Sequence, residues 1–536
     1  MIKAKITFLV SLTALTIIAF CGCDKKDMPK AADITNNAAA VKNREASTKA
    51  LLSNKLVTLT WASNDSYYSP ASLNNDLEVW KEIEKRTNVK IKWEPINRSR
   101  YDAEMQVKIS SGGNLPDILV VPNFDPTQYG QSGLFIPLEE LIEKHAPNIR
   151  KIFNEYPEVK ELMTSADGHI YGLAPIIKGS ADTLPLTFTI RKDWLKKLGM
   201  REPNTVEEWY QVLKAFQEKD PNGNGKKDEI PFGSSPYYLS EAFGLQLMSG
   251  SDYIVENNRV IYQWTDQRMI SFLRFARKLY EEGLLDNDFG VDTCETTEFK
   301  VINDRIGAYV NYPDWISSWQ KLLYAKGKKN ALYMPILPPQ GEGGERSLDS
   351  PGIIDKRFSS ISKDCKDPVI AIKLLDYLWS EEGIRYMAWG IEGKTYVLED
   401  GKPKLTEYVT NNKEGLGMSD VLRKVGAWPT VPWVQQREQY LQILSLDENF
   451  KNFPEMIKPV LKEPFPMLLA NKEEQDRLIM LETNITSYRE EMMVKIITGE
   501  EPVENFDKYV NTLKSMGLEE LVSIKQKQYE RYINHK

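Results

Sequence analysis

One short loop carries the most specific chemistry in the sequence. It reads Asp-Pro-Asn-Gly-Asn-Gly-Lys-Lys-Asp-Glu-Ile and begins at Asp220. Oxygen-bearing side chains stand at its first, third, fifth and ninth positions, and a glycine at the sixth permits a sharp turn, as in the first part of an EF-hand loop. Such alternate donors wrap a hard cation, so the predicted ion is calcium. The predicted ligands are Asp220, Asn222, Asn224, Lys226 through its carbonyl, Asp228 and Glu229.

The loop departs from the EF-hand pattern at its twelfth position. Pro231 stands where that pattern has a bidentate glutamate, so Glu229 at the tenth position has to supply the missing carboxylate. The alternative is a polar Asn-Gly turn between a helix and a strand, without a metal. Because the pattern leaves no open coordination position, we expect a structural ion rather than a catalytic one.

The second chemical signal is a set of aromatic residues in segments that read as loops. The chain has 12 Trp and 25 Tyr. A flat ring covers the apolar face of a pyranose, and Asp, Asn, Glu or Arg around it bind the hydroxyls. Trp315 is the best single candidate, because Pro313 and Asp314 interrupt regular structure beside it. The alternative is a place in the core, which we expect for the tryptophans in helical patterns, namely Trp80, Trp194, Trp209 and Trp379.

Composition excludes several classes of protein. With 69 Lys and Arg against 76 Asp and Glu, the net charge of −7 disfavours a nucleic-acid partner. Three His and four Cys, none in a CxxC or HExxH spacing, leave too little for a zinc site. We find no GxSxG, GxGxxG or phosphate-binding loop. Cys294 and Cys365 could form a disulfide or remain two buried thiols, and the sequence does not decide between them.

The N-terminus reads as an export signal. Lys3 and Lys5 precede an uncharged run that ends at Gly22, and its apolar part is too short to span a membrane. Phe20-Cys21-Gly22-Cys23 is similar to a bacterial lipobox, so residues 1–22 are the predicted signal peptide and Cys23 the predicted site of a diacylglycerol and palmitate anchor. An ordinary secretory signal is the alternative. Residues 23–54 are polar, lack aromatics and are predicted to form a flexible tether.

The folded body begins with alternating strands and helices. Val57, Leu59 and Trp61 alternate with polar or small residues, a helical pattern follows from Leu77, and residues 89–93 alternate again. This order predicts a βαβ unit, and the apolar run 118–121 predicts a further buried strand of an open α/β sheet. Ligands of such sheets bind beyond the carboxyl ends of the strands, which here means residues 63–69 and 122–129. Helical patterns dominate the second half, including a capping box at Thr205 and Glu208.

Several stretches in a fixed order resemble the family 1 extracellular solute-binding proteins of bacterial ABC importers, in particular the large calcium-containing oligosaccharide-binding lipoproteins. The resemblance runs from about residue 55 to the C-terminus, and the calcium loop matches at each predicted ligand, including the acid at its tenth position. The stretches are EKRTNVKI from Glu84, SGGNLPDI from Ser111, DGHIYGL from Asp167, IRKDWL from Ile190, the Asp220 loop, GIEGKTY from Gly390 and ITGEEP from Ile497.

The resemblance implies an α/β fold of the two-lobe, type II periplasmic-binding-protein kind, with strands that cross a hinge and an extended helical C-terminal region. It implies crossings near 171–175, 306–312 and 359–362. Lobe 1 would contain residues 55–172 and 312–358. Lobe 2 would contain residues 176–306 and 363–536, with the calcium loop 220–229.

The implied function is the capture of an oligosaccharide between the lobes and its delivery to the transmembrane permease. The protein would be a non-catalytic monomer, held by its lipid at the outer face of the cytoplasmic membrane in a Gram-positive-like envelope, and it would not bind nucleic acid. The implied ligand contacts are Asn64, Asp65, Tyr67, Tyr68, Asn123, Asp125, Tyr129, Trp315, Trp389 and Glu392. A hinge or packing role is the alternative for Trp389 and Glu392.

Two other functions remain open from the sequence. A surface glycoside hydrolase would use two carboxylates in a cleft, one of them with a raised pKa. A peptide-binding lipoprotein would bind free amino termini in place of glycans. The sequence also leaves the sugar open between neutral plant oligosaccharides and uronate-containing fragments, because a local basic wall could outweigh the net charge of the whole chain.

Overall fold

A computed structural model describes residues 51–535, except 66–70, 122–125, 178–185, 248–250, 292–293, 351, 356, 415, 436, 446–447 and 469. The predicted signal peptide, Cys23 and the tether up to residue 50 lie outside the described residues. Among the helices that are described, none is long and apolar enough to cross a membrane.

The first sheet has four strands in the order β12-β3-β1-β2. The strands β1 (Val57–Asn64), β2 (Val89–Ile96) and β3 (Ile118–Val120) are parallel, and β12 (Ser359–Ile361) is antiparallel to β3. The helix α2 (Glu78–Thr87) connects β1 to β2 and buries Val79, Trp80 and Ile83, so the predicted βαβ unit is confirmed. The ring of Trp93 stacks on Trp61 at 5.4 Å and meets the edge of Trp80 at 4.8 Å, which fixes this helix on the sheet.

The second sheet has the order β10-β5-β9-β6. It consists of β10 (Tyr333–Ile336), β5 (Thr187–Arg191), β9 (Ile306–Asn311) and β6 (Ile230–Phe232), with β5 antiparallel to both neighbours. The helices α8 (Lys192–Leu198), α9 (Val206–Glu218) and α12 (Pro313–Ala325) pack in the same core. Thr205 and Glu208 form the predicted capping box at the start of α9.

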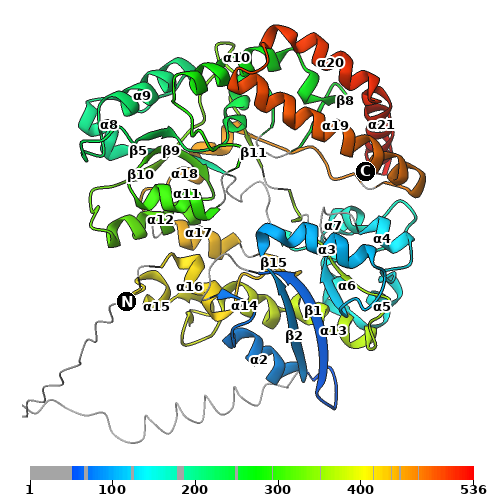
Figure 1. Cartoon of the computed structure of the whole chain (residues 1–536). Coiled ribbons are helices and arrows are strands. Elements are labelled where there is room, and N and C mark those ends of the chain that lie inside the picture. Colours follow the sequence, from blue (N-terminus) through cyan, green and yellow to red (C-terminus); the bar gives the residue numbers. More distant parts are fainter. Residues whose placement is uncertain are drawn as a thin grey trace, which may run out of the picture. The chain divides into compact units, whose positions relative to one another are not determined.

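The helical C-terminal region belongs to the second core. The helices α19 (Lys472–Thr498), α20 (Phe506–Ser515) and α21 (Leu518–His535) contribute buried residues such as Ile485, Tyr509 and Leu521 to it. Figure 1 shows them beside α10 (Arg268–Glu281), which α19 contacts directly. The helix α19 ends at Gly499, whose φ of 85° is one that glycine adopts without strain. The helical end of the chain expected from the sequence is therefore present.

The two cores divide the chain differently from the boundaries given above. Residues 312–358 were expected in lobe 1, but α12 and β10 pack in the core of the second sheet. Residues from 363 onward were expected in lobe 2, but α13 (Pro368–Leu378) contacts β12 of the first sheet and two helices that follow β3. The buried Asp376 carboxylate accepts the backbone N–H groups of Asn148 and Ile149, at 2.8 and 2.9 Å. The chain thus returns to the first sheet after β11 rather than after β9.

Short pairings join segments that follow the first sheet. The strand β4 (Ile176–Ile177) pairs in parallel with β15 (Val434–Gln435), and isolated bridges join Leu173 to Ser359 and Ile176 to Ile354.

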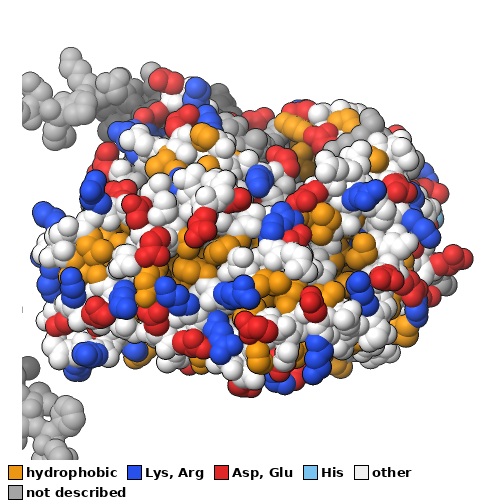
Figure 2. Space-filling model, turned by 90° about the horizontal axis from the view of Figure 1, so that it is seen from above, with side chains coloured by type: hydrophobic (Ala, Val, Ile, Leu, Met, Phe, Trp, Pro, Cys, Tyr) orange, Lys and Arg blue, Asp and Glu red, His pale blue; other side chains and the backbone are white. Residues whose placement is uncertain are grey.

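The face of the molecule seen in Figure 2 mixes charges of both signs with strips of apolar side chains. The four large core tryptophans predicted from helical patterns, Trp80, Trp194, Trp209 and Trp379, are all buried.

The remaining elements connect these layers. They are α3 (Tyr101–Ser110), α4 (Thr127–Gln131), α5 (Glu139–His145), α6 (Pro147–Glu155), α7 (Pro157–Met163), β7 (Tyr253–Glu256), β8 (Arg259–Tyr262), α11 (Cys294–Ile302), β11 (Leu348–Asp349), α14 (Glu381–Trp389), β13 (Tyr396–Glu399), β14 (Lys402–Leu405), α15 (Glu407–Thr410), α16 (Met418–Val425), α17 (Arg437–Ser445), α18 (Phe453–Ile457) and β16 (Leu461–Lys462).

Candidate metal loop and ligand cavity

The loop from Asp220 to Glu229 lies between α9 and β6 and is wound around one carboxylate. Asp220 has a positive φ of 44°, and its side chain accepts the backbone N–H groups of Gly223, Asn224 and Gly225 at 2.9, 3.1 and 3.0 Å. The amide oxygen of Asn222 accepts the N–H of Asn224 in the same way, at 3.0 Å. These bonds close the turn and gather the oxygen atoms of the first, third and fifth loop positions.

The two acids at the end of the loop have different surroundings. Asp228 accepts the side-chain amides of Asn222 and Asn224 at 3.2 and 2.9 Å. Burial disfavours its ionised form, but these two hydrogen bonds and the charges of Arg305 and Lys226 together outweigh burial and lower the pKa of Asp228. Both carboxylate oxygens of Glu229 are buried and have no hydrogen-bond partner. Burial therefore raises the pKa of Glu229, and the nearby charges of Asp220 and Asp228 raise it further.

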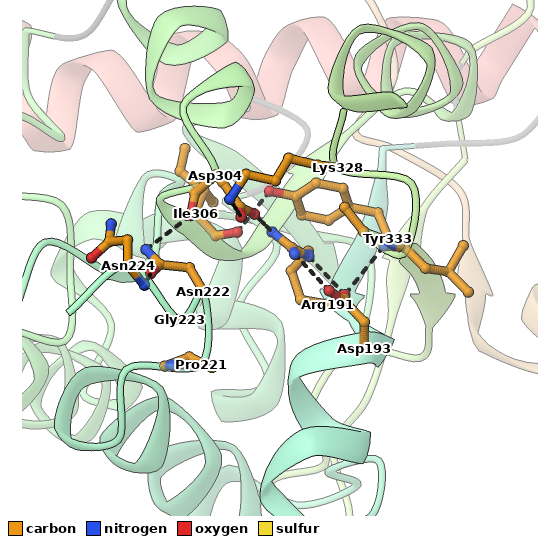
Figure 3. Close-up of polar contacts among 12 residues, drawn as sticks. Arg191, Asp193, Pro221, Asn222, Gly223, Asn224, Asp304, Ile306, Lys328 and Tyr333 are labelled. Atoms are coloured by element: carbon orange, nitrogen blue, oxygen red, sulfur yellow. Dashed lines mark hydrogen bonds and ion pairs between the residues drawn. The ribbon is translucent and has the colours of Figure 1, made fainter. Parts of the chain in front are cut away.

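A buried ion network holds the loop against the second sheet (Figure 3). The amide of Asn222 donates to the Asp304 carbonyl at 3.2 Å, while the Asp304 carboxylate accepts from Arg191 and pairs with Lys328 at 2.8 Å. Arg191 is only 2% exposed and also donates to Asp193 at 2.8 and 2.6 Å.

The residue after Asp304 adds a second tie. Arg305 donates from Nε to the carbonyl of Asp228 at 2.9 Å, and Lys197 of α8 donates to the carbonyls of Asp220 and Pro221 at 3.1 and 3.0 Å. Both ends of the loop are therefore fastened by basic side chains that bind its carbonyls. The position of the loop therefore depends on the residues just before β9 and on α8.

The donor set of the loop suits a hard cation. It combines carboxylate, amide and carbonyl oxygens, the ligands that calcium prefers, and Glu229 offers two buried oxygens that have no hydrogen-bond partner among the described residues. In the described part of the chain, no three His, Cys, Asp or Glu side chains converge closely enough to hold a metal. An ion in this loop would therefore depend on the two asparagines and on backbone carbonyls as much as on carboxylates.

At the carboxyl end of β1, the two predicted ligand contacts differ. The Asn64 side chain is 8% exposed, and its Oδ1 is buried without a hydrogen-bond partner. Asp65 instead accepts from the hydroxyl of Ser72 at 2.6 Å and the N–H of Leu73 at 2.9 Å. It therefore holds its own loop together, whereas Asn64 retains an unused acceptor at the sheet edge where ligands are expected.

The predicted ring contacts come from two helices. Tyr129 of α4 is half-buried and meets the edge of Phe135 at 5.6 Å. Trp315 lies in the first turn of α12, and the Arg423 guanidinium lies 5.9 Å from its ring and 5.7 Å from that of Trp428.

Three further side chains complete this aromatic pair. Arg423 forms ion pairs with Asp420 at 3.1 Å and Asp314 at 3.6 Å. The indole N–H of Trp428 donates to Gln439 at 2.9 Å. The structure thus brings Trp315 and Trp428 to one arginine.

The last pair of predicted contacts lies at the end of α14, which contacts α2. Trp389 is 3% exposed and its ring lies 6.3 Å from that of Tyr396, which favours the packing alternative. Glu392 is exposed and forms a backbone bridge with Tyr396. The other four predicted contacts, Tyr67, Tyr68, Asn123 and Asp125, lie outside the described residues.

A cavity of about 750 Å³ opens elsewhere, and sequence reasoning missed it. Its lining includes residues of α7, Tyr312, residues 349–350, 352–354 and 462–467, and Tyr529 and Tyr532 of α21. The six predicted ligand contacts that the structure describes do not line it. Its walls come from segments far apart in the chain, so no local pattern could have found it.

The protein has two separate sheets, each covered by helices, and the chain passes from the first sheet to the second and back. This is the architecture of a two-lobe solute-binding protein. The family model for bacterial extracellular solute-binding proteins matches residues 78–392, more than half of the chain. The chain belongs to this family.

Similar proteins extend the likeness to nearly the whole chain. It is 27% identical to the fructooligosaccharide ABC transporter substrate-binding protein FusA of Streptococcus pneumoniae serotype 4, over 89% of this chain and 90% of FusA. It is 26% identical to the lipoprotein LipO of Bacillus subtilis, over 86% and 90% of the two chains. The crystal structure of the alginate-binding protein AlgQ2 without calcium ion superposes with a TM-score of 0.79 at 25% identity, covering 90% of this chain and all of AlgQ2.

We predict that Asp304→Ala destabilises the protein strongly. It removes an acid partner of the buried Arg191, and breaking a buried ion pair of this kind costs about 3–5 kcal/mol. Urea unfolding followed by tryptophan fluorescence measures the loss. Glu281→Ala is the matched control, because it breaks the more exposed Arg277–Glu281 pair and should cost less than about 1 kcal/mol. Equal costs for the two variants would contradict the structural role of the network.

Proposed function

We propose that the protein is the substrate-binding subunit of an ABC importer and captures an oligosaccharide between its lobes. The observation that carries this proposal is the likeness to FusA, whose name gives both a transporter role and a sugar ligand and which matches over 89% of this chain. The half-exposed Trp315 beside Arg423 and the unused acceptor of Asn64 support it, because rings and polar side chains together bind pyranoses.

In this proposal the protein binds and releases its ligand and breaks no bond. A sugar that contacts both lobes has those contacts only in the closed form, so it shifts an open–closed equilibrium by its difference in affinity for the two forms. The permease would recognise the closed form. The protein would act as a monomer, and Asn64, Asp65, Tyr67, Tyr68, Asn123, Asp125, Tyr129 and Trp315 stay proposed ligand contacts.

We expect one class of glycan to stabilise residues 51–536. Ligand at 100 times its Kd stabilises a folded protein by about 2.7 kcal/mol, which is a rise of a few degrees in Tm for a chain of this size. A thermal-shift screen against a glycan library identifies the class, and chromatography of the recovered sugar tests for cleavage. Cleaved sugar would replace this proposal with the hydrolase alternative, and stabilisation by peptides alone would replace it with a peptide-binding protein.

We further propose that the loop 220–229 holds a structural calcium ion. Asp220, Asn222, Asn224, Asp228 and Glu229 would bind it with side-chain oxygens, and Lys226 with its carbonyl. The support is the pair of buried Glu229 oxygens without a partner, since a carboxylate in that position is costly unless a cation neutralises it. Among related proteins, AlgQ2 has a crystal structure without calcium ion, and FusA has one as an EF-hand mutant.

Replacing Glu229 by Gln should separate the two roles of this carboxylate. We expect calcium to raise the Tm of the wild type by a few degrees over EDTA, and this rise to be lost in Glu229→Gln. In EDTA the variant should be at least as stable as the wild type, because a neutral amide replaces an unpaired buried charge. Differential scanning calorimetry in both buffers measures this. The control Glu218→Gln, exposed at the end of α9, should keep the rise. A full calcium effect in Glu229→Gln would disprove the site.

Anchoring by a lipid on Cys23 is also proposed, with the body at the outer face of the cytoplasmic membrane. The lipobox-like Phe20-Cys21-Gly22-Cys23 supports it, and LipO, named a lipoprotein, is a relative. In a Gram-positive host, the full chain should incorporate labelled palmitate and remain with the membranes, and Cys23→Ser should lose the label. Cys365→Ser is the matched control and should keep it. Release of the wild type into the medium without label would favour the ordinary secretory signal.

A further inference from the structure

The cavity of about 750 Å³ has walls from both cores. The helix α7, which follows α6 near the first sheet, contributes Glu158 and Glu161 to it, and the segment 462–467 with the end of α21 forms the opposite side. Figure 1 shows α7 and α21 on the same side of the molecule. A space of this size accepts a few sugar units. Because segments of both cores line the cavity, a ligand bound in it would contact both cores.

Four aromatic rings line this cavity. Tyr312 follows β9 and is 45% exposed, although the residues around it are largely buried. Phe465, Tyr529 and Tyr532 add three half-buried rings, of which Phe465 stands between Pro464 and Pro466. Four rings with exposed area around one cavity provide apolar faces for sugar rings, and the tyrosine hydroxyls provide polar edges.

The charges of the lining are mainly negative. Among the lining residues that the structure describes, the ionisable side chains other than the tyrosines are Glu158, Glu161, Asp349, Glu463 and Lys462, four carboxylates against one amine. Glu158 and Glu161 are exposed and form no ion pair with any described residue. Carboxylates accept hydrogen bonds from sugar hydroxyls and repel a ligand that carries carboxylates of its own.

The arginines nearby do not reverse this balance. Arg357 is paired with Asp355, to which it donates at 2.8 Å. The charges of Arg98 and Arg357 lower the pKa of Tyr312, while those of Asp355 and Asp314 raise it. The Arg423 guanidinium between the two tryptophans is held by Asp420 and Asp314. Arg357 and Arg423 are therefore both paired with carboxylates, so neither guanidinium is free to bind a uronate.

We infer that this cavity is one part of the sugar-binding site, beside the contacts proposed above, that Tyr312, Phe465, Tyr529 and Tyr532 stack on the sugar there, and that its acidic wall selects uncharged oligosaccharides over uronate oligomers. The inference rests on the proposed function and specifies its substrate class. The distinction is a real one among relatives, which include a fructooligosaccharide-binding protein, an alginate-binding protein and a Bacillus subtilis polygalacturonan/rhamnogalacturonan-binding protein.

Isothermal titration of the full soluble chain, residues 51–536, tests the selectivity. The probes are nystose, xylotetraose and cellotetraose as neutral tetramers and tetragalacturonate as the charged one. We expect at least one neutral tetramer to bind at least tenfold more tightly than tetragalacturonate, with a gap that narrows as salt rises. Tighter binding of tetragalacturonate would overturn the inference and leave the proposed function standing. If no glycan in this set or in the library binds, the proposed function itself fails.

Two variants test the site with the tetramer that binds. Tyr532→Ala should weaken binding about tenfold by removing one stacking face, while Tyr324→Ala, an exposed ring of α12 outside the cavity, should not change it. Unchanged binding in Tyr532→Ala and in Tyr312→Ala would place the sugar elsewhere. The Tm of each variant without sugar confirms that it is folded.

A charge reversal tests the acidic wall. The double variant Glu158→Lys with Glu161→Lys should improve tetragalacturonate binding about tenfold and change neutral binding little. The matched control is Glu140→Lys with Glu143→Lys on α5, which alters the net charge equally but lies outside the cavity lining. An equal gain in both double variants would attribute the selectivity to overall charge and contradict a role for this wall.

Discussion

The second lobe depends on one buried cation. Arg191 ends β5 inside the protein, where an arginine without partners would be prohibitively costly, so the fold has to bring acids to it. Asp193 comes from the next helix and Asp304 from the turn before β9, which fixes how β5, α8 and β9 meet. Because Asn222 and Arg305 connect that same turn to the loop 220–229, the geometry of the loop is inherited from the ion network.

The loop is held in place by residues outside it, because the charged residues of the network all lie outside residues 220–229. Its carbonyls accept hydrogen bonds from Lys197 and Arg305, and its first carboxylate accepts three backbone N–H groups. Of the loop's described carboxylates, Glu229 alone has two buried oxygens without a hydrogen-bond partner, and it directly precedes β6. An ion bound there would stabilise β6 of the second sheet directly, which agrees with a role in stability rather than in ligand capture.

Local patterns predicted the local features well. The βαβ unit, the capping box at Thr205 and the buried tryptophans depend on residues close in sequence, and they appear as expected. The lobe boundaries were wrong for α12, β10 and α13, because an amphipathic helix or a buried strand has the same pattern in either lobe. What assigns them is contact between distant residues, such as Asp376 with Asn148, and no sequence window contains such a pair. The cavity escaped prediction for the same reason.

The wall formed by residues 462–467 has a consequence for how such proteins diverge. Pro464 and Pro466 have no backbone N–H, and in this stretch only the short strand β16 pairs with another strand, β11. Side-chain changes here would leave the hydrogen bonds of both four-stranded sheets untouched. Substitutions in this wall can therefore change the cavity without breaking the strand pairing of either sheet, so relatives about one quarter identical in sequence can keep one architecture while they bind different sugars.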